Sequence, residues 1–320
     1  MHIGNYNVRV PNCFFVMSVD NFVLQYKALR ALLLVCALCF IASCATPAYL
    51  QINQTAEQLG FARSTQNSTQ FEHVVYVPKR NTAGDSVHVY IEGDGVAWRW
   101  RYFIRPDPTP RRALMLNLMA RDGGNAIYVG RPCYFGAVID ERCHSDYWTF
   151  SRFSEKVVSS MVEVIAKQTA NFNKVVLIGH SGGGALAMLV AERLPDVVAV
   201  VTVAGNLDTE AWIEHHKYTP LRGSINPATR PPLHASIRQL HLLGNKDKVI
   251  PPSLVKNWIS NQPAAEVWEL PEYTHLCCWA KEWPRVLQWI ERAENDISFR
   301  IADKYSNIFS AKASRLRALN

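Results

Sequence analysis

The segment 175–188 constrains the fold of this chain more than any other stretch. It begins with Val-Val-Leu-Ile, continues with Gly-His-Ser-Gly-Gly-Gly and ends with Ala-Leu-Ala-Met. The unbroken apolar run predicts a strand buried on both faces of a sheet, and the closing residues predict a helix. The turn between them must be very tight, and Gly179, Gly182 and Gly183 permit the strained backbone that would lift Ser181 above the sheet edge. The pattern is also compatible with a glycine-rich turn whose serine only caps the helix.

Short apolar runs alternate with helical patterns along the rest of the chain, which is 48% hydrophobic and 19% charged, as in soluble globular proteins. We predict strands over 74–77, 87–92, 126–129, 175–178, 197–204, 238–243 and 266–270. We predict helices over 111–120, 153–170, 183–193, 252–261 and 282–294. This alternation predicts one α/β domain over 71–294, with a mostly parallel central sheet and helices on both faces.

One irregular stretch, 208–236, is longer than a simple connection between two strands requires. It contains Trp212, His215, His216 and Tyr218 together with several prolines. Loops of this length inside a compact domain are usually functional. We therefore predict a short cap or lid region here, whose two histidines line a pocket or face solvent.

A nucleophilic serine needs a base, and the base needs an acid to orient it. The strand over 238–243 runs into a turn with Asp247, 66 residues after Ser181, and His275 follows the last strand 28 residues later. Both positions lie at strand ends, where the side chains would meet Ser181 at one sheet edge. Asp208, after the preceding strand, is a rival acid. His180, adjacent to Ser181, cannot reach it as a base, so we expect it to serve local packing.

The stretch Glu92-Gly93-Asp94-Gly95 follows the third predicted strand. Its glycines would let the backbone N–H of Asp94 or Gly95 face a developing oxyanion, beside the N–H of Gly182 at the helix N-terminus. Aromatic residues after the third and fourth strands would form either an apolar pocket or ordinary packing. They are Trp98, Trp100, Tyr102, Tyr134, Phe135, Tyr147 and Trp148.

Taken in order, these motifs resemble the α/β-hydrolase superfamily over 71–294. The resemblance implies the fold of that name and acyl-enzyme hydrolysis, with Ser181 as nucleophile, His275 as base and Asp247 as the acid that fixes its tautomer. It implies a small-molecule or lipid acyl substrate, a carboxylic ester or thioester, and no cofactor. Glu92 stands where the family more often has histidine. A noncatalytic scaffold on this fold and an acyltransferase are the alternatives.

The first 43 residues indicate a targeting segment. Lys27 and Arg30 precede a run of twelve apolar residues, 31–42, which is too short to span a membrane as a helix. The end of the run, Ile-Ala-Ser-Cys at 41–44, resembles a bacterial lipobox. This resemblance implies cleavage before Cys44, acylation of Cys44 and attachment to the cell envelope. By the same analogy, Ala45 implies sorting to the outer membrane, facing the periplasm.

Residues 44–70 are polar and predict a tether followed by an entry segment, and 295–320 predict a basic tail. The formal net charge is +7, but much of the basic excess lies at the two ends, so we expect no nucleic-acid partner. The sequence does not define an oligomeric state.

The cysteines of an exported chain are candidates for disulfides. Cys133 and Cys143 would close a short loop, and we predict this pair. The alternative joins Cys133 to Cys277 or Cys278 across the sheet edge. No Cys-x-x-Cys spacing is present among these four cysteines, so we expect no metal site.

Overall fold

The computed structural model describes residues 26–32, 46–79, 83–137 and 140–296. The chain divides into two compact units, Met1–Thr46 and Pro47–Asn320. Residues 26–32 of the first unit are helical. Cys44 and the tail over 297–320 lie outside the described residues, as does most of the predicted targeting segment. In the part of the chain that is described, no helix is long and apolar enough to cross a membrane.

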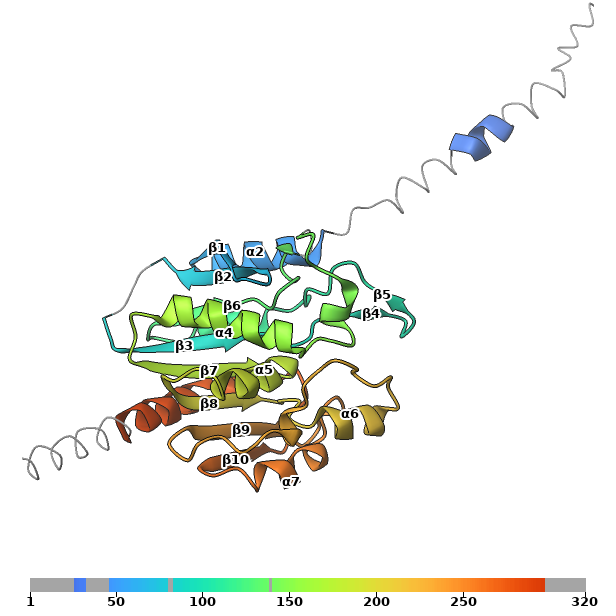
Figure 1. Ribbon diagram of the computed structural model, residues 1–320. Coiled ribbons are helices and arrows are strands. Elements are labelled where there is room, and N and C mark those ends of the chain that lie inside the picture. Colours follow the sequence, from blue (N-terminus) through green and yellow to red (C-terminus); the bar gives the residue numbers. More distant parts are fainter. Residues whose placement is uncertain (1–25, 33–45, 80–82, 138–139, 297–320) are drawn as a thin grey trace, which may run out of the picture. The chain divides into compact units, whose positions relative to one another are not determined.

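The second unit is built on an eight-stranded sheet with the order β1-β2-β6-β3-β7-β8-β9-β10 (Figure 1). Strand β2 runs antiparallel to its neighbours β1 and β6, and the remaining neighbours in this sheet pair in parallel. The predicted mostly parallel sheet is therefore confirmed. The strands are β1 (Phe61–Asn67), β2 (Glu72–Pro78), β3 (Ser86–Ile91), β6 (Ala126–Val129), β7 (Lys174–His180), β8 (Val197–Val203), β9 (Arg238–Gly244) and β10 (Ala265–Leu270).

Four of the five predicted helices form with shifted bounds, and in the described part of the second unit two further helices, over 48–58 and 209–216, lie where no helix is predicted. The predicted helix over 252–261 is a short 3₁₀ turn followed by a single helical turn, because Pro251 and Pro252 delay the start of regular hydrogen bonding. The last helix runs over 283–296. The others are α2 (Ala48–Gln58), α3 (Leu114–Met119), α4 (Glu155–Thr169), α5 (Gly182–Ala191), α6 (Thr209–His216) and α7 (Lys256–Ile259).

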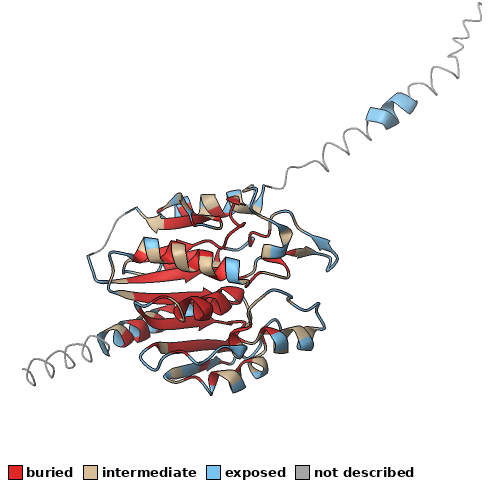
Figure 2. Ribbon diagram, viewed as in Figure 1, coloured by how far each residue is buried: buried red, intermediate tan, exposed pale blue. Residues whose placement is uncertain are grey.

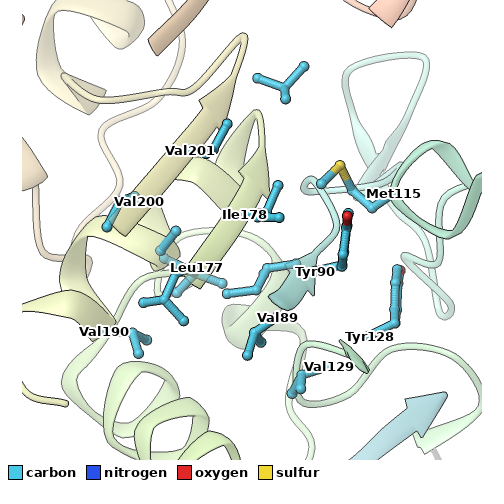
Figure 3. Close-up of a cluster of buried hydrophobic side chains, with 14 of the residues drawn as sticks. Val89, Tyr90, Met115, Tyr128, Val129, Leu177, Ile178, Val190, Val200 and Val201 are labelled. Carbon is cyan, nitrogen blue, oxygen red and sulfur yellow. The ribbon is translucent and has the colours of Figure 1, made fainter. Parts of the chain in front are cut away.

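The core lies on both faces of the central strands. Successive strand residues point to opposite faces, so Val89 faces the side of α5, where Val190 lies, while Tyr90 faces the side of Met115 in α3 (Figure 3). All four of these side chains are fully buried. Figure 2 shows the same pattern for the whole unit, with buried central strands and more exposed outer helices. The apolar runs of the sequence therefore form a sheet that is covered on both faces.

The prediction of a polar tether over 44–70 is wrong for most of that segment. Strand β1 pairs with β2 along its whole length, from Phe61 to Asn67. Helix α2 precedes it and buries Ile52 and Ala56, while its other face is polar. The sequence suggests a tether because an edge strand and an amphipathic outer helix expose most of their side chains. They bury the apolar side chains of Ile52, Ala56 and Phe61, and the backbone ladder with β2 joins β1 to the sheet.

Candidate active site

The three residues predicted to take part in catalysis lie close together at the carboxyl ends of the parallel strands. Ser181 follows β7, Asp247 follows β9 and His275 follows β10. A small hairpin, β4 (Trp98–Arg99) with β5 (Phe103–Ile104), lies at the same end of the sheet as α6 (Figure 1). Open α/β sheets bind their ligands at this edge. The topology therefore collects residues that are up to about a hundred positions apart in sequence.

Ser181 occupies a strained turn between β7 and α5. Its backbone has φ 52° and ψ −121°, in a region that costs non-glycine residues of order 1–3 kcal/mol. Gly179 must lack a side chain, because a Cβ atom there would lie 2.1 Å from the carbonyl oxygen of Gly183. The turn is held by hydrogen bonds on both sides: the Ser181 N–H donates to Val203, and its carbonyl accepts from Asn206, each over 3.0 Å. The structure thus fixes the serine in the tight turn that the sequence predicts.

Ser181, His275 and Asp247 form a chain of hydrogen bonds. His275 Nε2 lies 3.0 Å from Ser181 Oγ, and His275 Nδ1 lies 2.8 Å from Asp247 Oδ2. The Asp247 side chain is fully buried, and its other oxygen accepts backbone N–H groups from Val249 and Ile250 over 2.7 and 2.9 Å. A carboxylate held in this way directs one oxygen at the imidazole and keeps Nε2 free of a proton, facing the serine.

The rival acid Asp208 has a different role. Its Oδ1 accepts hydrogen bonds from the backbone N–H groups of Glu210 and Ala211, over 3.2 and 3.1 Å, at the start of α6. The same oxygen accepts from the side-chain amide of Asn226. Asp208 is therefore a helix N-cap. Of the two acids considered from sequence, the structure brings Asp247 to the histidine.

His180 does more than pack locally. It is buried, and its Nε2 donates over 2.9 Å to the backbone carbonyl of His275, which also accepts from Trp279 Nε1 over 3.1 Å. Burial, with the nearby His275 acting in the same direction, lowers the pKa of His180 to about 3, so its ring stays neutral. His180 is a positioning residue for the loop that presents His275. The adjacency of His180 to Ser181 in sequence gave no indication of this contact.

Two glycine-flanked segments meet beside the serine. Gly182 is the first residue of α5, so its N–H has no intrahelical acceptor. Asp94 and Gly95 line the same cavity as Ser181. The Asp94 carboxyl group packs directly on Gly182, where a Cβ atom would lie 2.1 Å from Asp94 Oδ1. The residues predicted as oxyanion donors are thus brought together around Ser181.

The Asp94 carboxylate is held by two buried arginines that the sequence analysis missed. Its Oδ1 accepts a short hydrogen bond from Arg131, and its Oδ2 accepts from Arg152 Nη1 over 3.1 Å. Burial alone would raise the pKa of Asp94, but the two guanidinium groups hold it below its usual range. A signal was present in the sequence, since Arg131 comes two residues after the strand over 126–129, at its carboxyl end.

Glu92 joins this loop to α3. One carboxyl oxygen accepts the N–H of Gly93 over 3.3 Å, and the other accepts the N–H of Met115 over 3.0 Å. The side chain is buried, and burial raises the pKa of Glu92 to about 7 in spite of these two hydrogen bonds. Glu92 therefore fastens the start of the Gly93–Gly95 segment.

A cavity of about 990 Å³ opens onto Ser181 and His275. The predicted aromatic residues divide between this cavity and the core: Trp98 and Tyr102 line the cavity, whereas Tyr134, Phe135 and Trp148 are buried and Trp100 is exposed. Tyr147 is partly buried against the core. From the long stretch over 208–236, Trp212, His216 and Tyr218 also line the cavity.

The predicted lid region is anchored to the loop that carries the acid. Trp212 Nε1 and His216 Nε2 both donate to the carbonyl of Val249, over 3.0 and 2.8 Å. His215 is exposed and does not line the cavity. The two histidines that the sequence analysis left open thus have different environments.

The cysteines pair within two local segments. Cys133 is joined to Cys143, the pair that the sequence predicts, and Cys277 is joined to Cys278. The alternative link between Cys133 and the 277–278 pair does not occur in this structure. No group of three or more His, Cys, Asp and Glu side chains suited to a metal ion is found among the described residues.

The chain was compared with known proteins. A sequence model of the alpha/beta hydrolase fold family matches residues 139–222. No curated protein sequence matches the chain. Among solved structures, the esterase Pf2001 of Pyrococcus furiosus is 12% identical with a TM-score of 0.51, and the match covers 74% of this chain and 94% of the esterase. Est1E from Butyrivibrio proteoclasticus is 12% identical with a TM-score of 0.50, covering 73% of this chain and 99% of Est1E. Together with the strand order, these matches show that the chain has the α/β-hydrolase fold.

Proposed function

We propose that this protein is a serine hydrolase that cleaves carboxylic esters or thioesters through an acyl-enzyme. One observation carries the proposal: the hydrogen-bonded chain from Ser181 through His275 to buried Asp247 ends in a cavity large enough for a small organic substrate. The esterases with the same fold are consistent with this chemistry. Their low identity leaves the substrate to be argued from the site itself.

In the first half-reaction, Ser181 Oγ bonds to the substrate carbonyl carbon while His275 Nε2 takes the hydroxyl proton. The negative charge that forms on the carbonyl oxygen is stabilised by backbone N–H groups, for which Gly182 and the Asp94–Gly95 segment are the candidates. The bond from carbon to the leaving oxygen or sulfur then breaks, and His275 gives its proton to the departing group. Asp247 keeps the imidazole in position throughout.

In the second half-reaction, water replaces the departed alcohol or thiol. His275 removes a proton from the water as its oxygen bonds to the acyl carbon, and the bond from that carbon to Ser181 Oγ breaks. The proton returns to Ser181, which releases a carboxylic acid and restores the enzyme.

The test is the Ser181→Ala variant. We expect it to lose at least about 10³-fold in turnover of 4-nitrophenyl esters, because the triad acts as a unit. A fluorophosphonate probe should label the parent protein at Ser181 and leave the variant unlabelled. The matched control is Ser236→Ala, since Ser236 is exposed and does not line the cavity. Folded parent protein that resists the probe would favour a noncatalytic scaffold.

We further propose that the enzyme is attached to the cell envelope through a lipid on Cys44. The support is the apolar run over 31–42 followed by Ser43 and Cys44. Two acyl chains give stable attachment where one is marginal. Intact-mass analysis of the envelope fraction should find residues 1–43 removed and Cys44 acylated. A lipid-free chain cut at another position would contradict this.

A further inference from the structure

We propose that the ester cleaved by this protein carries a fixed negative charge, a carboxylate or a phosphate, outside the scissile group, and that a cationic wall of the cavity binds it. The proposal rests on the function proposed above and adds the class of substrate. It arises from the charged side chains that line the cavity. Their ratio of cations to carboxylates is much higher than that of the whole chain.

Five cationic side chains and only two acidic ones line the cavity. The whole chain is far more balanced, with 34 Lys and Arg against 27 Asp and Glu. The cations come from four separate segments: the β4–β5 hairpin, the residues before α3, the residues before α4, and the end of α6. They are Arg101, Arg111, Arg112, Arg152 and Lys217.

The acidic side chains of the cavity are already engaged by the protein. Asp94 binds Arg131 and Arg152 at once, so this buried cluster of three groups retains one positive charge. Glu92 is buried and bound to two backbone N–H groups. Neither carboxyl group is therefore available to neutralise the cations nearer the solvent.

The outer cations have no acidic partner. Arg101, Arg111, Arg112 and Lys217 are exposed, and none forms an ion pair with a carboxylate among the described residues. Several exposed cations elsewhere on the surface do form ion pairs, for example Arg230 with Glu192, Lys246 with Glu272 and Lys256 with Glu269. Unpaired charges of one sign around a cleft attract and orient ligands of the opposite sign.

The floor between these cations is apolar. Trp98, Phe150 and Trp212 line it, and the Arg101 guanidinium lies 5.3 Å from the centroid of the Tyr218 ring, which brings the hairpin to the lid region. A site with an apolar floor and a cationic wall suits an amphiphilic molecule with an anionic end. Two kinds of ester combine an apolar part with an anionic end. One has a short acyl chain that ends in a carboxylate, and the other is a short-chain acylated alcohol that carries a phosphate.

The first experiment compares two esters that share a leaving group and a four-carbon acyl chain: mono(4-nitrophenyl) succinate, which is anionic, and 4-nitrophenyl butyrate, which is neutral. The variant is the double substitution Arg111→Gln and Arg112→Gln, at exposed positions that do not touch the triad. We expect its kcat/KM for the succinate ester to fall about 10-fold, with the butyrate value within about twofold of the parent. High ionic strength should reduce the preference of the parent for the anionic ester.

The control variant is Arg121→Gln. Arg121 is exposed and does not line the cavity. It should leave both kcat/KM values unchanged, which separates a local effect of the cavity cations from a change in overall charge. The proposal would be overturned if the double variant lost kcat/KM equally for the two esters. It would also be overturned if Arg121→Gln lost as much kcat/KM as the double variant.

The second experiment does not depend on hydrolysis. Full-length Ser181→Ala protein is titrated with dihexanoyl phosphatidic acid below its micelle concentration, followed by tryptophan fluorescence, since Trp98 and Trp212 line the cavity. Adding Arg111→Gln and Arg112→Gln should weaken binding about 10-fold. Tighter binding to vesicles of dioleoyl phosphatidic acid would identify a lipid source. Equal or weaker binding to these vesicles would identify a soluble anionic ester.

The two proposals fail in distinguishable ways. Parent protein that hydrolyses neither ester while the Ser181→Ala protein still binds the anionic lipid would refute the hydrolase and leave the anion site standing. Hydrolysis of both esters without preference, or lipid binding that ignores the arginine substitutions, would refute the anion site and leave the hydrolase standing.

Discussion

The contacts of single residues fix the segments beside the turn that carries Ser181. Asp94 contacts Gly182 on one side and two buried guanidinium groups on the other. A buried ion pair costs desolvation, so it is weak evidence for added stability. Its clear effect here is geometric, because it fixes the carboxyl group against the first turn of α5. The Glu92 carboxyl group accepts the N–H groups of Gly93 and Met115, and this ties Gly93, the residue before Asp94, to α3.

Glu92 makes folding stability depend on pH. Burial raises its pKa from 4.5 to about 7 in the folded protein, so between these values the folded state holds a proton that the unfolded chain releases. The free energy of unfolding should therefore fall as pH rises through this window. The expected fall is about 3 kcal/mol, because each pKa unit corresponds to about 1.36 kcal/mol. Glu92→Gln should lack this loss, so the variant should gain stability relative to the parent between pH 4.5 and 7, measured by urea unfolding.

The control for this prediction is Glu163→Gln. A hydrogen bond from Lys167 lowers the pKa of Glu163 to about 2, so its contribution is lost only below pH 4.5. Between pH 4.5 and 7 the control should follow the parent. A Glu92→Gln profile parallel to that of the parent would contradict the prediction, whatever constant offset its lost hydrogen bond produces.

At the scale of elements, the edge of the sheet depends on a segment that looks dispensable in sequence. Helix α2 and strand β1 cover β2, whose other neighbour is β6. Without them, β2 would present an unpaired edge, and such edges promote aggregation. The lid region is a second case, since two hydrogen bonds join α6 to the loop of Asp247.

We predict that a chain beginning at residue 68 is less stable than one beginning at Pro47. The shorter chain loses the buried side chains of Ile52, Ala56 and Phe61, which should cost at least about 3 kcal/mol at typical values for buried apolar groups. Denaturant midpoints of the two chains measure the difference, and light scattering measures association through β2. Equal midpoints would mean that 47–67 is a tether after all.

At the scale of the whole molecule, the fold brings segments from most of the chain to one edge of the sheet. The triad comes from the ends of β7, β9 and β10, and the cationic wall comes from segments before α3, after α6 and between β4 and β5. In the proposed hydrolase, this arrangement would separate two tasks: strand ends would hold the reacting groups rigidly, and longer connections would carry the groups that contact the substrate. Variation in the connections can change substrate preference while the triad stays in place.

The sequence by itself determined the local parts of this structure. The strand, turn and helix around Ser181 follow from an apolar run and three glycines, and the order of Asp247 and His275 follows from where later strands end. These features could be predicted because they depend on neighbours in the chain and on the fixed geometry of parallel strands. Sequence alone left the choice between Asp247 and Asp208 open, since both follow strands.

Only the tertiary structure decided which distant side chains meet. It paired Asp94 with Arg131 and Arg152, and it turned His180 toward the carbonyl of His275. It also separated the cavity aromatics from the core aromatics and brought four exposed cations, without carboxylate partners among the described residues, to the lining of the cavity. The physical reason is that burial, charge pairing and cavity shape depend on contacts between segments far apart in the chain, and no local pattern of residues specifies those contacts.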